Sequence, residues 1–360
     1  MSAPLATTSQ PSNRTQENAV STEMLLLGAG ASVEAGIPDA KTMARRIVKK
    51  FEDERRLKGE ADVLTFVNAQ LIADAQRRAG DPSIDCVDVE ALYNAILLLF
   101  ERDELEISPF VQEWLPKLAT ISKDVLESIM LRIEMMLEEL TLIKDEARVQ
   151  YLGPILNLAR RQDRLFIATL NYDNGIELLS RAKGMPCDTA IEEWKKTGIL
   201  HYPNDGINLI KLHGSVYWLW SKDARTYDKR LPHRLIRTKS HFDEKLPLTV
   251  LVETPMVIFG QHNKLTAEGP FLDLLKRFDE QLQNSDLLTV VGYSFRDSHI
   301  NFYISKFLNQ YGGKIRIVDP GFKGSNVDYI EHLREFSTMR PNQIDIVEKY
   351  AGDALKVLYP

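Results

Sequence analysis

Short apolar runs recur along the chain and end in small or polar residues. Six of them are MLLLGAG (24–30), LFIATLN (165–171), INLIKLHG (207–214), PMVIFG (255–260), LLTVVGYSF (287–295) and KIRIVDP (314–320). Runs that are apolar on both faces are typical of strands in a buried parallel sheet. Stretches with helical spacing separate most of them. The alternation predicts an α/β fold with a doubly wound parallel sheet of about six strands, whose ligand site lies at the carboxyl ends of the strands.

The long gap between the first two predicted strands has a helical pattern. In VLESIMLRIEMMLEELTLI (125–143), apolar residues recur every three or four positions. We therefore predict a large helical insertion after the first βα unit, at about 51–160. Its methionines at 130, 135 and 136 would suit an adaptable partner-binding surface, but core packing is the commoner reason for this spacing.

The chain as a whole is expected to consist of a leader and one domain. Residues 1–22 are rich in Ser, Thr, Gln, Asn and Pro and lack the basic start and apolar stretch of a signal peptide, so we expect a disordered leader. Residues 23–360 are expected to form one domain. A small irregular module is expected within it, at about 184–254.

Composition excludes several classes of protein. A net charge of -6 gives no overall cationic field, so we expect neither direct nucleic-acid binding nor membrane binding. The purely apolar runs are much shorter than the roughly 18 residues of a membrane span. The only cysteines, Cys86 and Cys187, form neither a disulfide framework nor a paired-cysteine zinc site, which suits a reducing cytoplasm.

The first strand runs into a glycine turn, in MLLLGAGASVEAGIPDA (24–40). Many folds receive a dinucleotide phosphate at such a turn. A dehydrogenase would have a third glycine where Val33 stands, and then a second strand with an acidic end. The chain also lacks the GK[ST] ending of a phosphate-binding loop. Hydride transfer and ATP hydrolysis therefore both lose support.

Five motifs follow one another in a characteristic order: GAGAS (28–32), GIPDA (36–40), TLNYDNG (169–175), KLHGS (211–215) and VVGYSF (290–295). This order closely resembles the signature of the sirtuin family and of its bacterial sirtuin-like, NAD-hydrolysing relatives. The resemblance implies a Rossmann-like sheet and NAD as the substrate. It covers the α/β part of the chain and leaves the helical insertion and the leader unexplained.

The resemblance also implies which residues contact NAD. Glycines allow close backbone approach, and a serine hydroxyl can donate to an oxygen. Asp39 is equally suited to cap the helix that follows it, and Asp319 to a plain turn. The segment RDSHIN (296–301) would lie near the adenosine. The implied contacts are Gly28, Ala29, Gly30 and Ser32 for the phosphates, Ile37, Pro38 and Asp39 for the ribose and nicotinamide, and Gly292, Ser294 and Asp319 for the adenosine.

Asn171, Asp173 and His213 are the catalytic candidates. Asn171 and Asp173 stand where sirtuins have the Asn and Asp of TQNID, and the sirtuin asparagine places the ribose and a water near the anomeric carbon. An amide can donate and accept at once. His213 corresponds to the catalytic histidine of sirtuins, and a neutral imidazole can accept a proton near neutral pH.

True deacetylating sirtuins carry a zinc module of four cysteines, which two distant cysteines cannot build. The resemblance therefore implies an NAD glycohydrolase that releases nicotinamide and ADP-ribose, without a metal. Known bacterial relatives deplete NAD in antiphage defence, usually as oligomers. Many are paired with a HerA-type translocase ATPase or a short Argonaute, so we expect a homo-oligomer activated by assembly or by a partner. A protein deacylase or ADP-ribosyltransferase, and a non-catalytic scaffold that binds NAD or ADP-ribose, remain alternatives.

Overall fold

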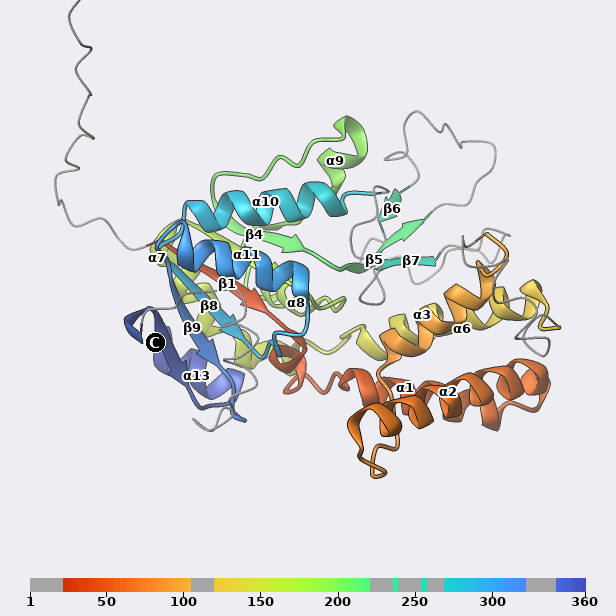
Figure 1. Ribbon diagram of the computed structural model, residues 1–360. Coiled ribbons are helices and arrows are strands. Elements are labelled where there is room, and N and C mark those ends of the chain that lie inside the picture. Colours follow the sequence, from red (N-terminus) through yellow and green to blue (C-terminus); the bar gives the residue numbers. More distant parts are fainter. Residues whose placement is uncertain (1–21, 105–119, 221–235, 239–253, 258–268, 322–340) are drawn as a thin grey trace, which may run out of the picture.

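A seven-stranded parallel sheet forms the centre of the computed structural model, which describes residues 22–104, 120–220, 236–238, 254–257, 269–321 and 341–360 (Figure 1). The strand order is β10-β9-β8-β1-β2-β4-β3. The chain builds one half of the sheet outward from β1 and then returns to place β8 on the other side of β1. The strands are β1 (Glu23–Leu27), β2 (Arg164–Thr169), β3 (Cys187–Asp188), β4 (Gly206–Lys211), β8 (Leu287–Val291), β9 (Lys314–Val318) and β10 (Ile344–Val347).

Helices cover both faces of this sheet, and alternate residues of β1 show how the two layers pack. Met24 and Leu26 belong to the core beneath α10 (Phe271–Gln283) and α11 (Ser298–Asn309). Leu25 and Leu27 belong to the opposite core, which includes residues of α7 (Pro154–Gln162), α8 (Gly175–Ala182) and α13 (Ala351–Leu358). Because side chains alternate across a strand, the near-continuous apolar sequence of β1 is the one that a doubly covered strand requires.

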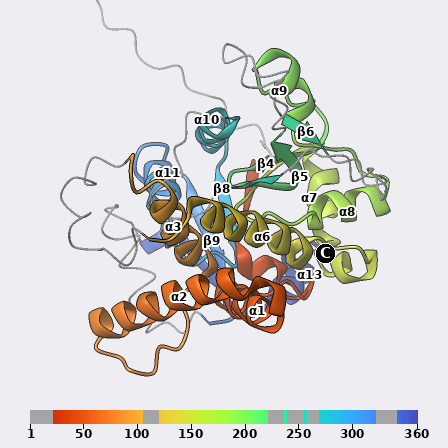
Figure 2. The ribbon, with the colours of Figure 1, turned by 90° about the vertical axis from the view of Figure 1, so that its right-hand side faces the viewer.

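A helical group lies beyond the carboxyl ends of the strands (Figures 1 and 2). Its helices α1, α2, α3 and α6 pack against one another. The 3₁₀ segment η3 (Glu146–Leu152) and α7 then lead the chain back to β2. The bounds are α1 (Ala40–Asp53), α2 (Lys58–Ala79), α3 (Val89–Phe100) and α6 (Lys123–Thr141). The predicted methionine packing holds for Met136, which is buried, whereas Met135 is exposed.

A second, three-stranded sheet follows β4. Its strands are β5 (Gly214–Trp220), β6 (Ile236–Thr238) and β7 (Thr254–Val257), and β5 pairs antiparallel with the other two. The prediction that PMVIFG (255–260) is a strand of the parallel sheet is therefore wrong, because a short apolar run does not reveal the direction of its partner. The predicted strand 207–214 also divides, at a turn formed by Leu212 and His213.

The predicted α/β fold with a parallel sheet and a helical insertion is confirmed. The predicted irregular module at 184–254 includes β3 and β4 of the main sheet together with α9 (Ile191–Thr197). Residues 1–21 of the predicted leader lie outside the described part of the chain. In the part that the structure describes, no helix is both long and apolar enough to cross a membrane.

The loops that follow β1 and β8 cross in close contact. Gly30 N donates to Gly292 O (2.8 Å), and Gly28 N donates to Val291 O (2.9 Å). A Cβ on Gly28 would lie 2.6 Å from Gly292 O. Gly292 itself has a φ of +62°, and a Cβ there would clash with the backbone of Gly30 and Ala31. The three glycines are therefore required by contact between two backbones, whatever else they contact.

We expect Gly292→Ala to lower the free energy of unfolding by about 2–4 kcal/mol, because the substitution adds a positive-φ residue and a backbone clash. Gly312→Ala is the matched control, since Gly312 has a φ of +73° with no heavy atom within 4 Å of an added Cβ. Its expected cost is about 1 kcal/mol. Urea unfolding followed by circular dichroism measures both, and equal losses would contradict a tight crossing.

Candidate functional site

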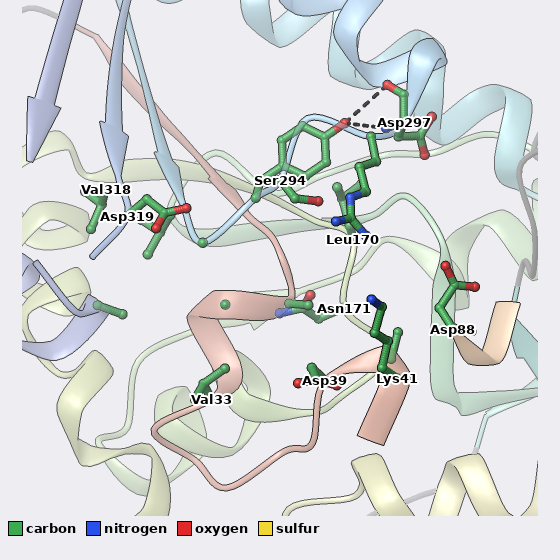
Figure 3. Close-up of a pocket in the computed structure, with 18 of the residues that line it drawn as sticks. Val33, Asp39, Lys41, Asp88, Leu170, Asn171, Ser294, Asp297, Val318 and Asp319 are labelled. Carbon is green, nitrogen blue, oxygen red and sulfur yellow. Dashed lines mark hydrogen bonds between the residues drawn. The ribbon is translucent and has the colours of Figure 1, made fainter. Parts of the chain in front are cut away.

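A pocket of about 580 Å³ opens at the carboxyl ends of the central strands. Loops after β1, β2, β4, β8 and β9 contribute to it, as do the N-terminal ends of α1, α3 and α13. Figure 3 shows Asp319 and Asp88 toward opposite ends, with Asn171 between them. The volume lies within the range of small-molecule sites, and the position is the switch point at which open α/β sheets bind ligands.

Most of the predicted site residues line this pocket. They come from every motif of the predicted set, although those motifs are spread over residues 28–295. The lining residues among them are Ala29, Gly30, Asp39, Asn171, His213, Gly292, Ser294 and Asp319. The other predicted residues do not line the pocket, namely Gly28, Ser32, Ile37, Pro38 and Asp173.

The carboxamide of Asn171 is held in one orientation. Its Nδ2 donates to the carbonyl oxygen of Gly28 (2.9 Å) and to Oγ of Ser32 (2.9 Å). Its backbone N–H donates to Oγ1 of Thr169, the last residue of β2 (3.0 Å). Both amide hydrogens are therefore used within the protein. Oδ1 has no donor among the described residues, and it is available to accept a hydrogen bond from a ligand hydroxyl or from water.

Ser32 and Asp173 support Asn171 from behind. Ser32 Oγ donates to Oδ2 of Asp173 (2.6 Å), whose Oδ1 accepts from the N–H of Gly175 (2.8 Å). The fully buried Lys211 donates from Nζ to the Asp173 carbonyl (2.5 Å) and to Oε1 of Glu177 (2.9 Å). The Ser32 hydroxyl and the Asp173 carboxylate were predicted to contact the ligand. Here they form hydrogen bonds within the protein that fix the 169–175 loop.

His213 lies on the turn that leads from β4 into β5, and its side chain is 8% exposed. Its Nε2 is 3.0 Å from Oδ2 of Asp297, whose side chain is 5% exposed. Because a carboxylate only accepts, Nε2 carries the hydrogen of this bond. The sequence predicts that RDSHIN, which contains Asp297, lies near the adenosine. In the structure the Asp297 carboxylate contacts His213 and lines the pocket.

Asp39 caps a helix, which is one of the two roles that the sequence left open, and it also lies on the pocket. Its Oδ1 accepts from Thr42 N (2.7 Å) and caps α1, and it also lines the pocket. The backbone N–H of Thr42 holds the pKa of the Asp39 carboxyl below its usual range. Asp319 likewise accepts from Gly321 N (2.7 Å) in a turn while lining the pocket.

Several lining residues were not among the predicted site residues. Lys41 and Arg296 are the lining cations. Lys41 directly follows GIPDA, and Arg296 is the first residue of RDSHIN, the segment expected near the adenosine. Asp88 and Glu90 come from the start of α3, and Tyr350, which is 60% exposed, comes from the start of α13. The first two could have been found from their neighbours. The last three carry no local signal, because only the fold brings them to the pocket.

The described residues contain no group of three or more His, Cys, Asp or Glu side chains suited to a metal ion. Cys86 is buried beside α1, and its thiol donates to carbonyl oxygens of Lys41 and Val87 (3.3 and 3.0 Å). Cys187 lies on β3 at the edge of the sheet, so the two cysteines occupy different parts of the molecule.

Comparison with known proteins finds a family model that matches part of the chain. No curated protein matches it. Similar solved structures include a SIR2 homologue in complex with NAD (16% identity, TM-score 0.40, 94% of this chain and 87% of that chain). They also include a Sir2 homologue mutant in complex with ADP-ribose (14%, 0.41, 94% and 90%) and Sir2Tm bound to a propionylated peptide (14%, 0.37, 94% and 91%). Residues 165–334 match the family model of the SIR2-like domain, so this part of the chain is similar to sirtuins.

Proposed function

We propose that this protein is an NAD glycohydrolase, which cleaves NAD with water to give nicotinamide and ADP-ribose. The SIR2-like domain supports an NAD-dependent activity. The observation that carries the proposal is the presence of Asn171 and His213 on the lining of one pocket, each held by hydrogen bonds to the protein. A module that only binds a dinucleotide has little need of such a pair.

The chemistry requires little more than placement. The bond between nicotinamide and the ribose C1′ breaks with its electron pair going to the ring nitrogen, so nicotinamide leaves as a neutral molecule. A C1′–O bond forms with water, and a proton is released. Oδ1 of Asn171 would accept from the attacking water or a ribose hydroxyl, and His213 would accept the proton. No metal is needed, because the cationic nicotinamide is already a good leaving group.

The rest of the pocket suits the other parts of NAD. Lys41 and Arg296 offer positive charge for the diphosphate, and Ala29 and Gly30 offer backbone at the glycine turn. Asp319 provides a carboxylate for the adenosine ribose hydroxyls, and the exposed ring of Tyr350 offers a surface on which adenine can stack. On this arrangement the nicotinamide end lies toward His213, Asp88 and Glu90.

We extend the proposal to the setting that the sequence resemblance implies. The enzyme would deplete NAD in antiphage defence, and a homo-oligomer or a partner such as a HerA-type translocase ATPase or a short Argonaute would switch it on. The helical group is the part of the chain beyond the sheet that reaches the pocket, through α1 and α3, so a partner that contacts it has a direct route to the site.

The purified protein is expected to release nicotinamide and ADP-ribose from NAD, and His213→Ala and Asn171→Ala are each expected to lower kcat at least about 100-fold. Both variants should still fold and bind NAD. His201→Ala is the matched control, because His201 is exposed and lies outside the pocket lining. Chromatographic product analysis over a concentration series measures the rate, and a steep concentration dependence would indicate activation by assembly.

Two results would contradict the hydrolase. Transfer of ADP-ribose to a protein, or removal of an acyl group from a lysine peptide, with little release to water would identify a transferase. NAD binding without product at any protein concentration, and also with the co-purified native partner, would identify a scaffold.

Asp319→Ala is expected to lower kcat/KM for NAD about 10- to 100-fold, because a charged hydrogen bond contributes about 1.5–3 kcal/mol. The same substitution should raise the ratio of NADP to NAD hydrolysis at least about tenfold, since the carboxylate repels a 2′-phosphate. Rates with both dinucleotides provide the test. An equal loss for NAD and NADP would mean that Asp319 serves only its turn.

A further inference from the structure

We propose that Asp297 is the positioning residue of His213, and that the two side chains act as one unit in proton transfer. This inference rests on the proposed hydrolase for its kinetic consequence. It begins from the buried contact between Nε2 of His213 and Oδ2 of Asp297, at 3.0 Å. Within the described residues, Nδ1 of His213 has no hydrogen-bond partner, and the imidazole lines the pocket.

The loop between β8 and α11 holds the carboxylate from several sides. Oδ1 of Asp297 accepts from His299 N (3.1 Å) and caps α11, which leaves Oδ2 for the histidine. The N–H of Asp297 donates to the Tyr293 hydroxyl (3.1 Å), which lies 3.0 Å from Oδ1 of Asn301. Burial, and then the Asp297 carboxylate, raise the pKa of the Tyr293 phenol, so it stays protonated within this network.

The backbone of the same loop is strained. Phe295 is fully buried with a φ of +54°, which an L residue other than Asn or Asp rarely adopts. The carbonyl oxygen of Phe295 accepts a hydrogen bond from Nδ2 of Asn301 (2.6 Å). The ring of Phe295 packs against the ring of Tyr293, with the two centroids 4.9 Å apart. Capping of α11 by Asp297 requires neither the positive φ of Phe295 nor Oδ2 of Asp297. Placing Oδ2 against His213 explains both features.

The contact has two chemical consequences. First, it keeps the hydrogen on Nε2, so Nδ1 holds the lone pair that can accept a proton from water or from a ribose hydroxyl. Second, the carboxylate stabilises the imidazolium that this transfer creates, until the proton passes to solvent. Asp297 stays ionised throughout, and the overall reaction still converts NAD and water to nicotinamide, ADP-ribose and one proton.

Kinetics of Asp297→Asn test the proposal, because asparagine keeps the shape and the helix cap but removes the charge. We expect kcat for NAD to fall about 100-fold with KM changed less than about threefold. Asp297→Glu should recover part of the rate. In a His213→Ala background, Asp297→Asn should cause no further loss, since residues that act as a unit are not additive. Asp81→Asn, an exposed turn carboxylate that also accepts a backbone N–H, is the matched control.

If Asp297 were merely structural, one of two results would be seen. The Asp297→Asn variant would keep most of kcat, or the fold-losses in kcat of the two single variants would multiply in the double variant. Either result would overturn the proposal while leaving the hydrolase intact.

An activity-independent measurement covers the case in which the wild type is inactive. Nitrogen NMR of histidine-labelled protein, with the His213 signals assigned by His213→Gln, reports which ring nitrogen carries hydrogen. A fixed Nε2–H form in the wild type, replaced in Asp297→Ala by an average of the two neutral forms, would support the positioning. An averaged or Nδ1–H signal in the wild type would overturn it. Absence of hydrolysis together with a fixed Nε2–H form would count against the proposed function alone.

Discussion

The pocket depends on one constraint, the close crossing of the backbones that follow β1 and β8. These strands are parallel neighbours, so their loops leave the sheet at the same edge, and three glycines let the loops touch. The contact fixes Gly28 and Gly30 against Gly292. It also sets the carbonyl of Gly28, which accepts from Nδ2 of Asn171. Glycine at this switch point therefore positions both the backbone proposed to bind the phosphates and the amide of the catalytic candidate Asn171.

A buried polar network beneath the pocket makes this arrangement rigid. Ser32, Asp173 and Lys211 connect the loops after β1 and β2 with the end of β4 through hydrogen bonds, and Ser32 and Lys211 are buried. Burying an ammonium group is costly unless it is paired, and Glu177 provides the opposite charge. We interpret the costly burial of Lys211 as preorganisation of the pocket. The network holds the amide of Asn171 in place, so it does not have to be oriented when a ligand binds. Ser32 and Asp173, which the motifs predict as ligand contacts, here form hydrogen bonds that support the pocket-lining Asn171.

The sequence predicted the site best where candidate residues lie close to the carboxyl ends of strands. Asn171 and His213 each lie two residues beyond the end of a buried strand. Parallel strands bring their carboxyl ends to one edge, so the convergence of these two residues was predictable. Asp297 was not, although it lies two residues beyond a quoted motif, because its partner is 84 positions away and depends on how the β8–α11 loop folds back. Asp88, Glu90 and Tyr350 were missed for the same physical reason. β7 was assigned to the wrong sheet because hydrophobicity records burial and not pairing direction.

The helical group is attached to the site at several points, and this bears on how the pocket can change. α1 and α3 each begin at an aspartate that lines the pocket, and the end of α6 leads to Ile143. The buried Asn174 exchanges hydrogen bonds with the backbone N–H and carbonyl of Ile143 (2.8 and 2.9 Å) and contacts the Tyr217 hydroxyl (2.6 Å). Asn174 stands three residues after Asn171. Because each buried bond left unmade costs about 1–3 kcal/mol, a displacement of α6 must either break this connection or carry the 169–175 loop with it. The helices that the family resemblance left unexplained are thus mechanically part of the site.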